Sequence, residues 1–147
     1  MKSKFIIYSL FFLIAISAIL SCAKTDTIPA LQFQKQLLAG TGKYQNTLHS
    51  WQLDSTKING ANVLLTNTQK NFKKTFLFDG AYFDSDNNLG KWEITTINKL
   101  KQTIIYQSLN RQDSVVYDIV SINAAQLNLS IKLSNGQTAI YSFKISN

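Results

Sequence analysis

Residues 126–133 read Gln-Leu-Asn-Leu-Ser-Ile-Lys-Leu, and the chain then meets Asn135-Gly136. Leucine or isoleucine stands at every second position of this stretch, with polar residues between. Because successive side chains of a strand point to opposite faces of a sheet, this alternation predicts a strand with one buried face. Asn-Gly is a strong signal for a tight hairpin. A second alternating run follows the turn, with apolar residues at Tyr141, Phe143 and Ile145.

The same period of two extends backward to His49. Trp51 and Leu53 alternate with polar residues and lead to Asn59-Gly60, a second hairpin signal, from which Val63–Thr66 is expected to return as a strand. Further strands are expected at Lys73–Phe78, Ala81–Asp84, Lys91–Thr95, Gln102–Ser108 and Ser114–Ile122. Ahead of them, a short helix is expected over Ala30–Ala39, with glycines at its end.

These segments make eight or nine short strands joined by tight turns, with no helical segment long enough for a parallel crossover. The topology expected is therefore an all-β antiparallel up-and-down meander. Closing the sheet into a barrel hides its aromatic face and removes its exposed edges. A sandwich would also hide that face, but its Greek-key connections usually need longer loops than these.

The N-terminus has the pattern of a secretory signal. Lys2 and Lys4 precede an apolar run over Phe5–Leu20, which is short for a membrane span. The junction Ile19-Leu20-Ser21-Cys22 resembles a bacterial lipobox, whose cysteine becomes the lipid-bearing first residue of the mature chain. We expect residues 1–21 to be a lipoprotein signal peptide, Cys22 to carry the lipid, and residues 22–30 to form a flexible tether.

The resemblance to lipoproteins implies two or three acyl chains, palmitate among them, and hence stable attachment to a membrane. One acyl chain alone gives only marginal binding. The location expected is the outer membrane, on either its periplasmic face or the cell surface, since Lys24 and Asp26 just after the cysteine leave both open.

Composition excludes several functions. The 147 residues carry 15 basic and 8 acidic side chains, one cysteine and one histidine. A single cysteine and a single histidine cannot build a disulfide framework or a zinc site of cysteine and histidine ligands. Loss of Lys2 and Lys4 with the signal would leave 13 basic against 8 acidic residues, or +5. Scattered lysines and a single arginine argue against nucleic acid as a partner.

No catalytic or cofactor motif is present. His49 is the sole histidine and Glu93 the sole glutamate, and the sequence has no Gly-x-Ser-x-Gly elbow, phosphate loop or dinucleotide fingerprint. Residues 84–90 are similar to a calcium loop, but Thr95 stands where the bidentate glutamate belongs. We expect no enzyme activity, no cofactor and no metal.

Several motifs occur in an order similar to that of the small lipocalin-like domains of bacterial surface lipoproteins. They are Leu37-Leu38-Ala39-Gly40, Trp51-Gln52-Leu53, Phe76–Tyr82, Gly90–Ile94, Leu127-Asn128-Leu129 and Tyr141-Ser142-Phe143. The resemblance implies an eight-stranded lipocalin-like barrel over residues 31–147, often proposed to hold a small apolar molecule, and it implies no catalysis.

The inward aromatic residues are the candidate site. A barrel of this size is wide enough either to be filled by its own side chains or to enclose one small ligand. Both interpretations remain open for Trp51, Phe76, Phe78, Trp92, Tyr106, Tyr117, Tyr141 and Phe143.

Two functions follow from these two interpretations. The first is a lipid-anchored envelope protein that binds a small hydrophobic or amphipathic ligand inside its barrel. The alternative is an accessory or inhibitor protein with a filled barrel, which contacts another envelope protein through its outer surface; a surface rich in amides and hydroxyls would suit such wet, polar contacts.

Overall fold

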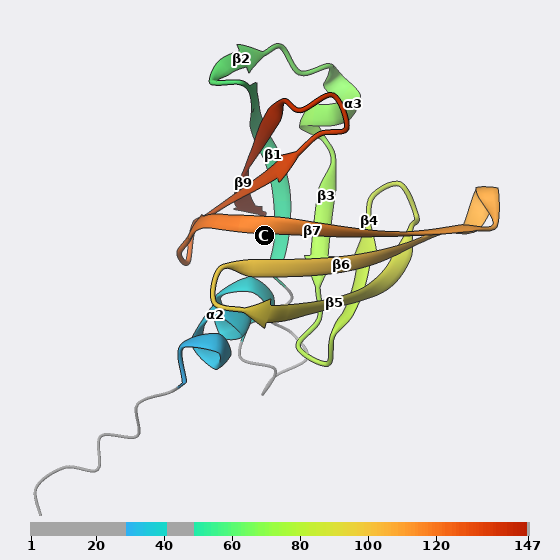
Figure 1. Cartoon of the computed structure of the whole chain (residues 1–147). Coiled ribbons are helices and arrows are strands. Elements are labelled where there is room, and N and C mark those ends of the chain that lie inside the picture. The colour runs from blue at the N-terminus through green and yellow to red at the C-terminus, as the bar shows by residue number, and fades with distance from the viewer. Residues whose placement is uncertain (1–28, 41–48, 147) are drawn as a thin grey trace, which may run out of the picture.

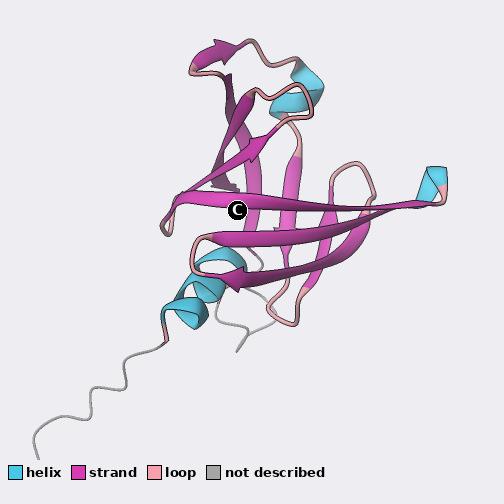
Figure 2. Ribbon diagram, viewed as in Figure 1, coloured by secondary structure: helices cyan, strands magenta, loops and turns pink. Residues whose placement is uncertain are grey.

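A computed structural model describes residues 29–40 and 49–146, and in that part the chain forms a closed antiparallel β-barrel with a helix at each end (Figures 1 and 2). The elements in chain order are α2 (Ala30–Ala39), β1 (His49–Ile58), β2 (Ala61–Val63), α3 (Asn67–Lys70), β3 (Lys73–Phe76), β4 (Ala81–Asp84), β5 (Leu89–Thr96), β6 (Lys99–Tyr106), the 3-10 turn η1 (Gln107–Leu109), β7 (Arg111–Ile122), β8 (Gln126–Lys132) and β9 (Thr138–Ser146).

The barrel is closed by the pairing of β1 with β9. From β3 onward each strand pairs with the next along the chain, and Ser50–Ile58 then pairs with Ala139–Ser146. β2 pairs with β1 at Thr56–Ile58 and β3 pairs with it at His49–Gln52. Because β2 and β3 share one side of β1, the nine strands occupy eight positions, which confirms the predicted eight-stranded up-and-down barrel with a short N-terminal helix.

Both predicted Asn-Gly turns are present. Asn59 and Gly60 have φ values of 48° and 82°, the left-handed backbone that a two-residue hairpin turn requires. The Asn59 side chain also accepts a hydrogen bond from the Thr138 amide at 3.0 Å, so this turn is tied to β9 across the barrel closure. At the other turn, Gly136 has a φ of 83°.

The return strand predicted over Val63–Thr66 is wrong beyond its first residue. β2 ends at Val63, and Thr66 caps the short helix α3. The Thr66 hydroxyl accepts a hydrogen bond from the Gln69 amide, and the Gln69 side chain accepts one from the Thr66 amide. This reciprocal capping box satisfies amides that a strand would have paired, so local polar chemistry prevails over the apolar run before it.

Other strand boundaries move as well, and β5 spans Leu89–Thr96 where Lys91–Thr95 was predicted. β6 spans Lys99–Tyr106 where Gln102–Ser108 was predicted, and η1 takes up the residues that follow. β7 begins at Arg111, earlier than the predicted Ser114. β3 ends at Phe76, so Phe78 lies in the turn to β4. In each case the hydrogen-bonded pairing of neighbouring strands sets the boundary, which alternation of side chains alone does not determine.

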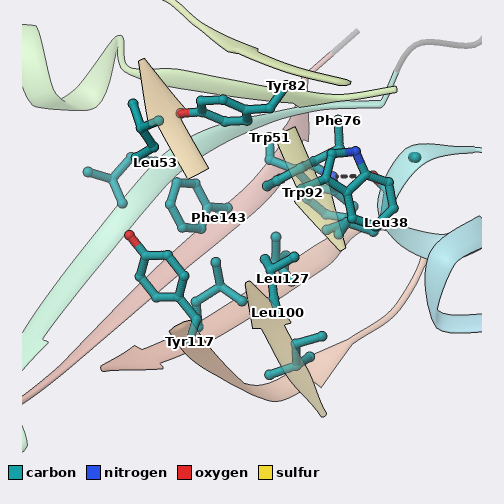
Figure 3. Packing of buried hydrophobic residues seen from close by; sticks show 14 of the residues in the cluster. Leu38, Trp51, Leu53, Phe76, Tyr82, Trp92, Leu100, Tyr117, Leu127 and Phe143 are labelled. Atoms are coloured by element: carbon teal, nitrogen blue, oxygen red, sulfur yellow. Dashed lines mark hydrogen bonds between the residues drawn. The ribbon is translucent and has the colours of Figure 1, made fainter. Parts of the chain in front are cut away.

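α2 covers one end of the barrel. Its residues Leu38 and Ala39 are buried, and the Trp51 indole nitrogen donates a hydrogen bond to the Leu38 carbonyl at 2.8 Å. This end of the interior is filled by Trp51, Phe76 and Trp92; the rings of Phe76 and Trp92 meet edge to face at 5.6 Å (Figure 3). α3 lies at the opposite end (Figure 1).

The predicted signal peptide, the lipid-bearing Cys22 and most of the tether fall outside the described residues. In residues 29–40 and 49–146, neither helix has the length and apolar character needed to cross a membrane.

Gly90→Ala tests how tightly β5 and β6 pack. A Cβ at this position would lie 1.9 Å from the Thr103 carbonyl oxygen, so we expect the free energy of unfolding to fall by about 3 kcal/mol, measured by urea denaturation. Gly136→Ala is the matched control: it has open space but a φ of 83°, and should cost about 1 kcal/mol. Equal losses in the two variants would contradict the close approach.

Candidate ligand-binding site

A cavity of about 270 Å³ opens at the α3 end of the barrel. Its walls come from α3, β1, β3, β7, β9, the segment between α3 and β3, and the turn after β4. The lining residues are Leu53, Thr68, Gln69, Phe72, Lys74, Asp86, Tyr117, Tyr141 and Phe143. Most of this wall is aromatic or aliphatic, with hydroxyl, amide and charged groups at intervals, which is the composition of a small-molecule site.

Hydrogen bonds to two backbone carbonyls hold α3 and the residues after it over β1. The Leu53 amide donates to the Phe72 carbonyl at 2.9 Å, and the Gln52 side chain donates to the Lys70 carbonyl at 2.8 Å. These bonds place Phe72 against the barrel interior and leave Thr68 and Gln69 at the mouth of the cavity. The position of the mouth therefore depends on the capped turn that the sequence pattern did not reveal.

The predicted aromatic residues separate into three groups. Tyr117, Tyr141 and Phe143 line the cavity. Trp51, Phe76 and Trp92 fill the opposite end, where the Trp92 indole donates to the Leu77 carbonyl at 2.9 Å. Figure 3 shows Tyr117, Leu53 and Phe143 apart from Trp92 and Leu38.

Phe78 and Tyr106 belong to neither group. Both are partly buried and pack at the edge of the core. The Lys35 ammonium of α2 lies 4.7 Å from the centre of the Phe78 ring, and the Arg111 guanidinium lies 5.5 Å from that of Tyr106. Interior core and cavity thus coexist in one barrel, and these two rings stand outside the cavity wall.

A lysine is buried at the base of the cavity. The Lys74 side chain is 7% exposed, and its Nζ donates a hydrogen bond to Gln102 Oε1 at 3.0 Å. Four rings surround the Nζ, with centroids at 5.0 to 6.0 Å: Tyr117, Tyr82, Phe72 and Phe143. Burial lowers the pKa of the Lys74 ammonium to about 8, against an opposing effect of the Asp84 carboxylate.

The negative charge of Asp84 acts to raise the pKa of Lys74. The Asp84 oxygens accept their hydrogen bonds from other groups. Asp84 Oδ2 accepts a hydrogen bond from the Tyr82 hydroxyl at 2.7 Å and from the Asn88 side chain at 3.1 Å. Oδ1 accepts from the amides of Asp86 and Asn88 at 3.0 and 3.1 Å. The carboxylate therefore shapes the turn after β4 and acts on Lys74 through space.

The two buried tyrosines keep their protons to high pH. Burial, together with the hydrogen bond to Asp84, raises the pKa of Tyr82 above its usual range. Burial raises the pKa of Tyr117 to about 12, with further contributions from Tyr141 and Tyr106. At neutral pH both rings present neutral hydroxyls.

Four polar residues of this interior were missed from the sequence: Lys74, Tyr82, Asp84 and Gln102. Their positions along the strands could have indicated that these side chains point inward. Lys74 stands two residues before buried Phe76 on β3, and Gln102 stands two before buried Ile104 on β6. Strand alternation therefore puts both side chains on the inner face, whatever their polarity.

The remaining candidates have structural partners. His49 Nδ1 lies 3.1 Å from the Leu37 carbonyl, which can only accept, so this nitrogen carries the proton. Within the described ranges, no group of three or more His, Cys, Asp or Glu side chains is placed to hold a metal ion. Asp84 of the calcium-like loop instead accepts the hydrogen bonds of its own turn.

Comparison with known proteins gives one similar structure. No family model matches the chain, and no curated protein matches it. A crystal structure of a lipocalin-like protein from Bacteroides uniformis is similar over 71% of this chain and 96% of that one, with 16% identity and a TM-score of 0.40. The assignment of the barrel therefore depends on the strand order and closure described above.

Lys74 makes stability depend on pH. The folded protein holds Lys74 with a pKa of about 8 against 10.5 unfolded, so the unfolded chain binds more protons between these values. The free energy of unfolding should rise by up to about 2 kcal/mol from pH 8 to pH 10. Urea denaturation at both values measures this.

Lys74→Met is the control for this pH dependence, since it keeps the shape of the side chain and removes the titrating group. The rise should be absent in this variant. An equal rise in both proteins would assign the effect to other groups. Above pH 10 the raised pKa values of Tyr82 and Tyr117 act in the opposite direction, so the comparison ends there.

Proposed function

We propose that this protein binds a small amphipathic molecule in the cavity at the α3 end of its barrel, while a lipid on Cys22 holds it at the outer membrane. The cavity carries the first part of the proposal. It has room beyond its own side chains, and its walls are formed mainly by Leu53, Phe72, Tyr117, Tyr141 and Phe143. Burial of an apolar ligand surface there gains about 25 cal/mol per Å² before ordering costs.

Charged groups in the cavity wall favour a ligand with a head group over a pure hydrocarbon. Lys74 and Asp86 line the same space as the aromatic rings. One positive and one negative group, with Asp84 behind them, leave no net positive charge to attract an anion. A neutral head group such as a hydroxyl or carbonyl suits this end better than a carboxylate.

The open cavity favours ligand binding over the alternative, an accessory protein that acts only through its outer surface. A filled barrel would support that alternative, but the core leaves a cavity of about 270 Å³ at the α3 end. The lipid anchor is supported by the sequence pattern of residues 1–22, which combines a basic start, an apolar run and a lipobox-like junction.

Thr68→Trp tests the cavity. Thr68 is an exposed residue of α3 at the mouth, so an indole there should block entry with little effect on the core. With 1-decanol at about 100 times its dissociation constant, the full chain in phosphatidylcholine nanodiscs should melt about 5 °C or more higher. Thr68→Trp should lose most of this shift.

Thr95→Trp places the same side chain at an exposed position on β5, away from the cavity lining. It should keep the full shift in melting temperature. The cavity proposal fails if decanol and related neutral amphiphiles leave the melting temperature of the unsubstituted protein unchanged, or if both variants respond alike.

Cys22→Ser tests the anchor. In a Gram-negative host fed labelled palmitate, the unsubstituted chain should incorporate label and fractionate with membranes, and the variant should do neither, because serine lacks the acceptor thiol. Mass spectrometry of the N-terminal peptide gives the modification directly. An unmodified thiol on Cys22 of the protein from its native host would contradict lipid attachment.

A further inference from the structure

The amine of Lys74 has few hydrogen-bonding and ionic partners. Its Nζ makes one hydrogen bond to the described residues, to Gln102 Oε1. None of the salt bridges in the described part of the chain includes Lys74, and the oxygens of Asp84 are already bonded to Tyr82, Asn88 and backbone amides. Four aromatic rings occupy the rest of its surroundings. Their faces attract an ammonium, whereas the loss of water around the buried amine favours its uncharged form and lowers its pKa to about 8.

A second polar group beside Lys74 also lacks a partner. The Gln102 side chain is fully buried, and its Nε2 is the one buried side-chain nitrogen or oxygen of the described residues without a hydrogen bond. Because Oε1 of the same amide contacts the lysine, this free N–H donor lies next to the amine. An unsatisfied buried donor is costly. Gln102 does not line the cavity itself and is joined to it through Lys74.

We propose that Lys74 is a covalent attachment site for aldehydes, forming a reversible imine with a ligand whose apolar tail fills the cavity. The Nζ lone pair attacks the carbonyl carbon, a C=N bond replaces the C=O bond, and the two amine hydrogens leave with the oxygen as water. No oxidant or reductant takes part. This inference depends on the cavity binding proposed above.

The chemistry of the site supports a carbonyl ligand in particular. A neutral amine is the nucleophile in imine formation, and desolvated lysines are the ones that act in this way. With its pKa near 8, Lys74 holds about 300 times more free amine at neutral pH than a lysine at 10.5. Gln102 Oε1 holds the amine at 3.0 Å, and Lys74 itself lines the space that the ligand would fill.

Octanal with sodium cyanoborohydride tests the proposal. The full chain in phosphatidylcholine nanodiscs, a lipid without a primary amine, should gain one octyl group at pH 7. Peptide mapping should place it on Lys74 at least about tenfold in excess of Lys73, its neighbour on β3. Lys74→Arg keeps the positive charge without a primary amine and should lose this product. Lys73→Arg, the matched control, should retain it.

The pH dependence gives a second readout that needs no variant. Trapping at Lys74 should rise with pH and level off above about pH 8. The titratable groups that face this amine from the surrounding elements are Asp84, Asp86, Tyr82, Tyr117 and Tyr141. Continued growth of Lys74 trapping up to pH 10, in parallel with Lys73, would overturn the inference.

The failures of the two proposals can be told apart. If decanol raises the melting temperature but octanal labels Lys74 no faster than Lys73, the cavity binds and the imine does not form. If decanol leaves the melting temperature unchanged and octanal does not label Lys74 selectively, both the cavity proposal and the imine proposal are contradicted. Selective, saturable labelling that decanol suppresses supports both.

Discussion

The pairing of β1 with β9 is the constraint on which the rest of this structure depends. It joins the first and last long strands of the sheet and turns one face of each strand, except the short exposed β2, into a common interior. Once the sheet is closed, whatever side chain alternation places inward must be packed, bonded or left beside a cavity. At the α2 end the solution is packing, by Trp51, Phe76 and Trp92. At the α3 end the Lys74 amine lies among aromatic rings, and a cavity remains beside it.

The polar interior explains how one barrel can have both a stable core and an open site. Burying a lysine costs free energy, which Asp84 and the surrounding rings offset only in part. The result is a side chain with a lowered pKa beside a buried amide whose N–H is unused. Such residues are poor choices for stability alone, and perturbed groups of this kind concentrate at functional sites.

Much of the fold could be predicted from the sequence because it rests on alternation and turn chemistry. The bounds of α2, the hairpin at Asn59-Gly60 and the uninterrupted pattern of β8 all follow from local residues. α3 was missed because Thr66-x-x-Gln69 is a weak signal after a strand-like run. The site was half predicted: Tyr117, Tyr141 and Phe143 were placed inside by their apolar rings. Lys74 and Gln102 are harder to predict, because their polarity indicates the outer face while their positions on β3 and β6 place them inside.

The same closure also bears on when the protein can fold. β1 meets its longest partner, β9, only after all the strands between them have been synthesised. Until then the early strands lack one edge of their pairing, and contacts so distant in sequence form slowly. The barrel can therefore close only once β9 has been synthesised.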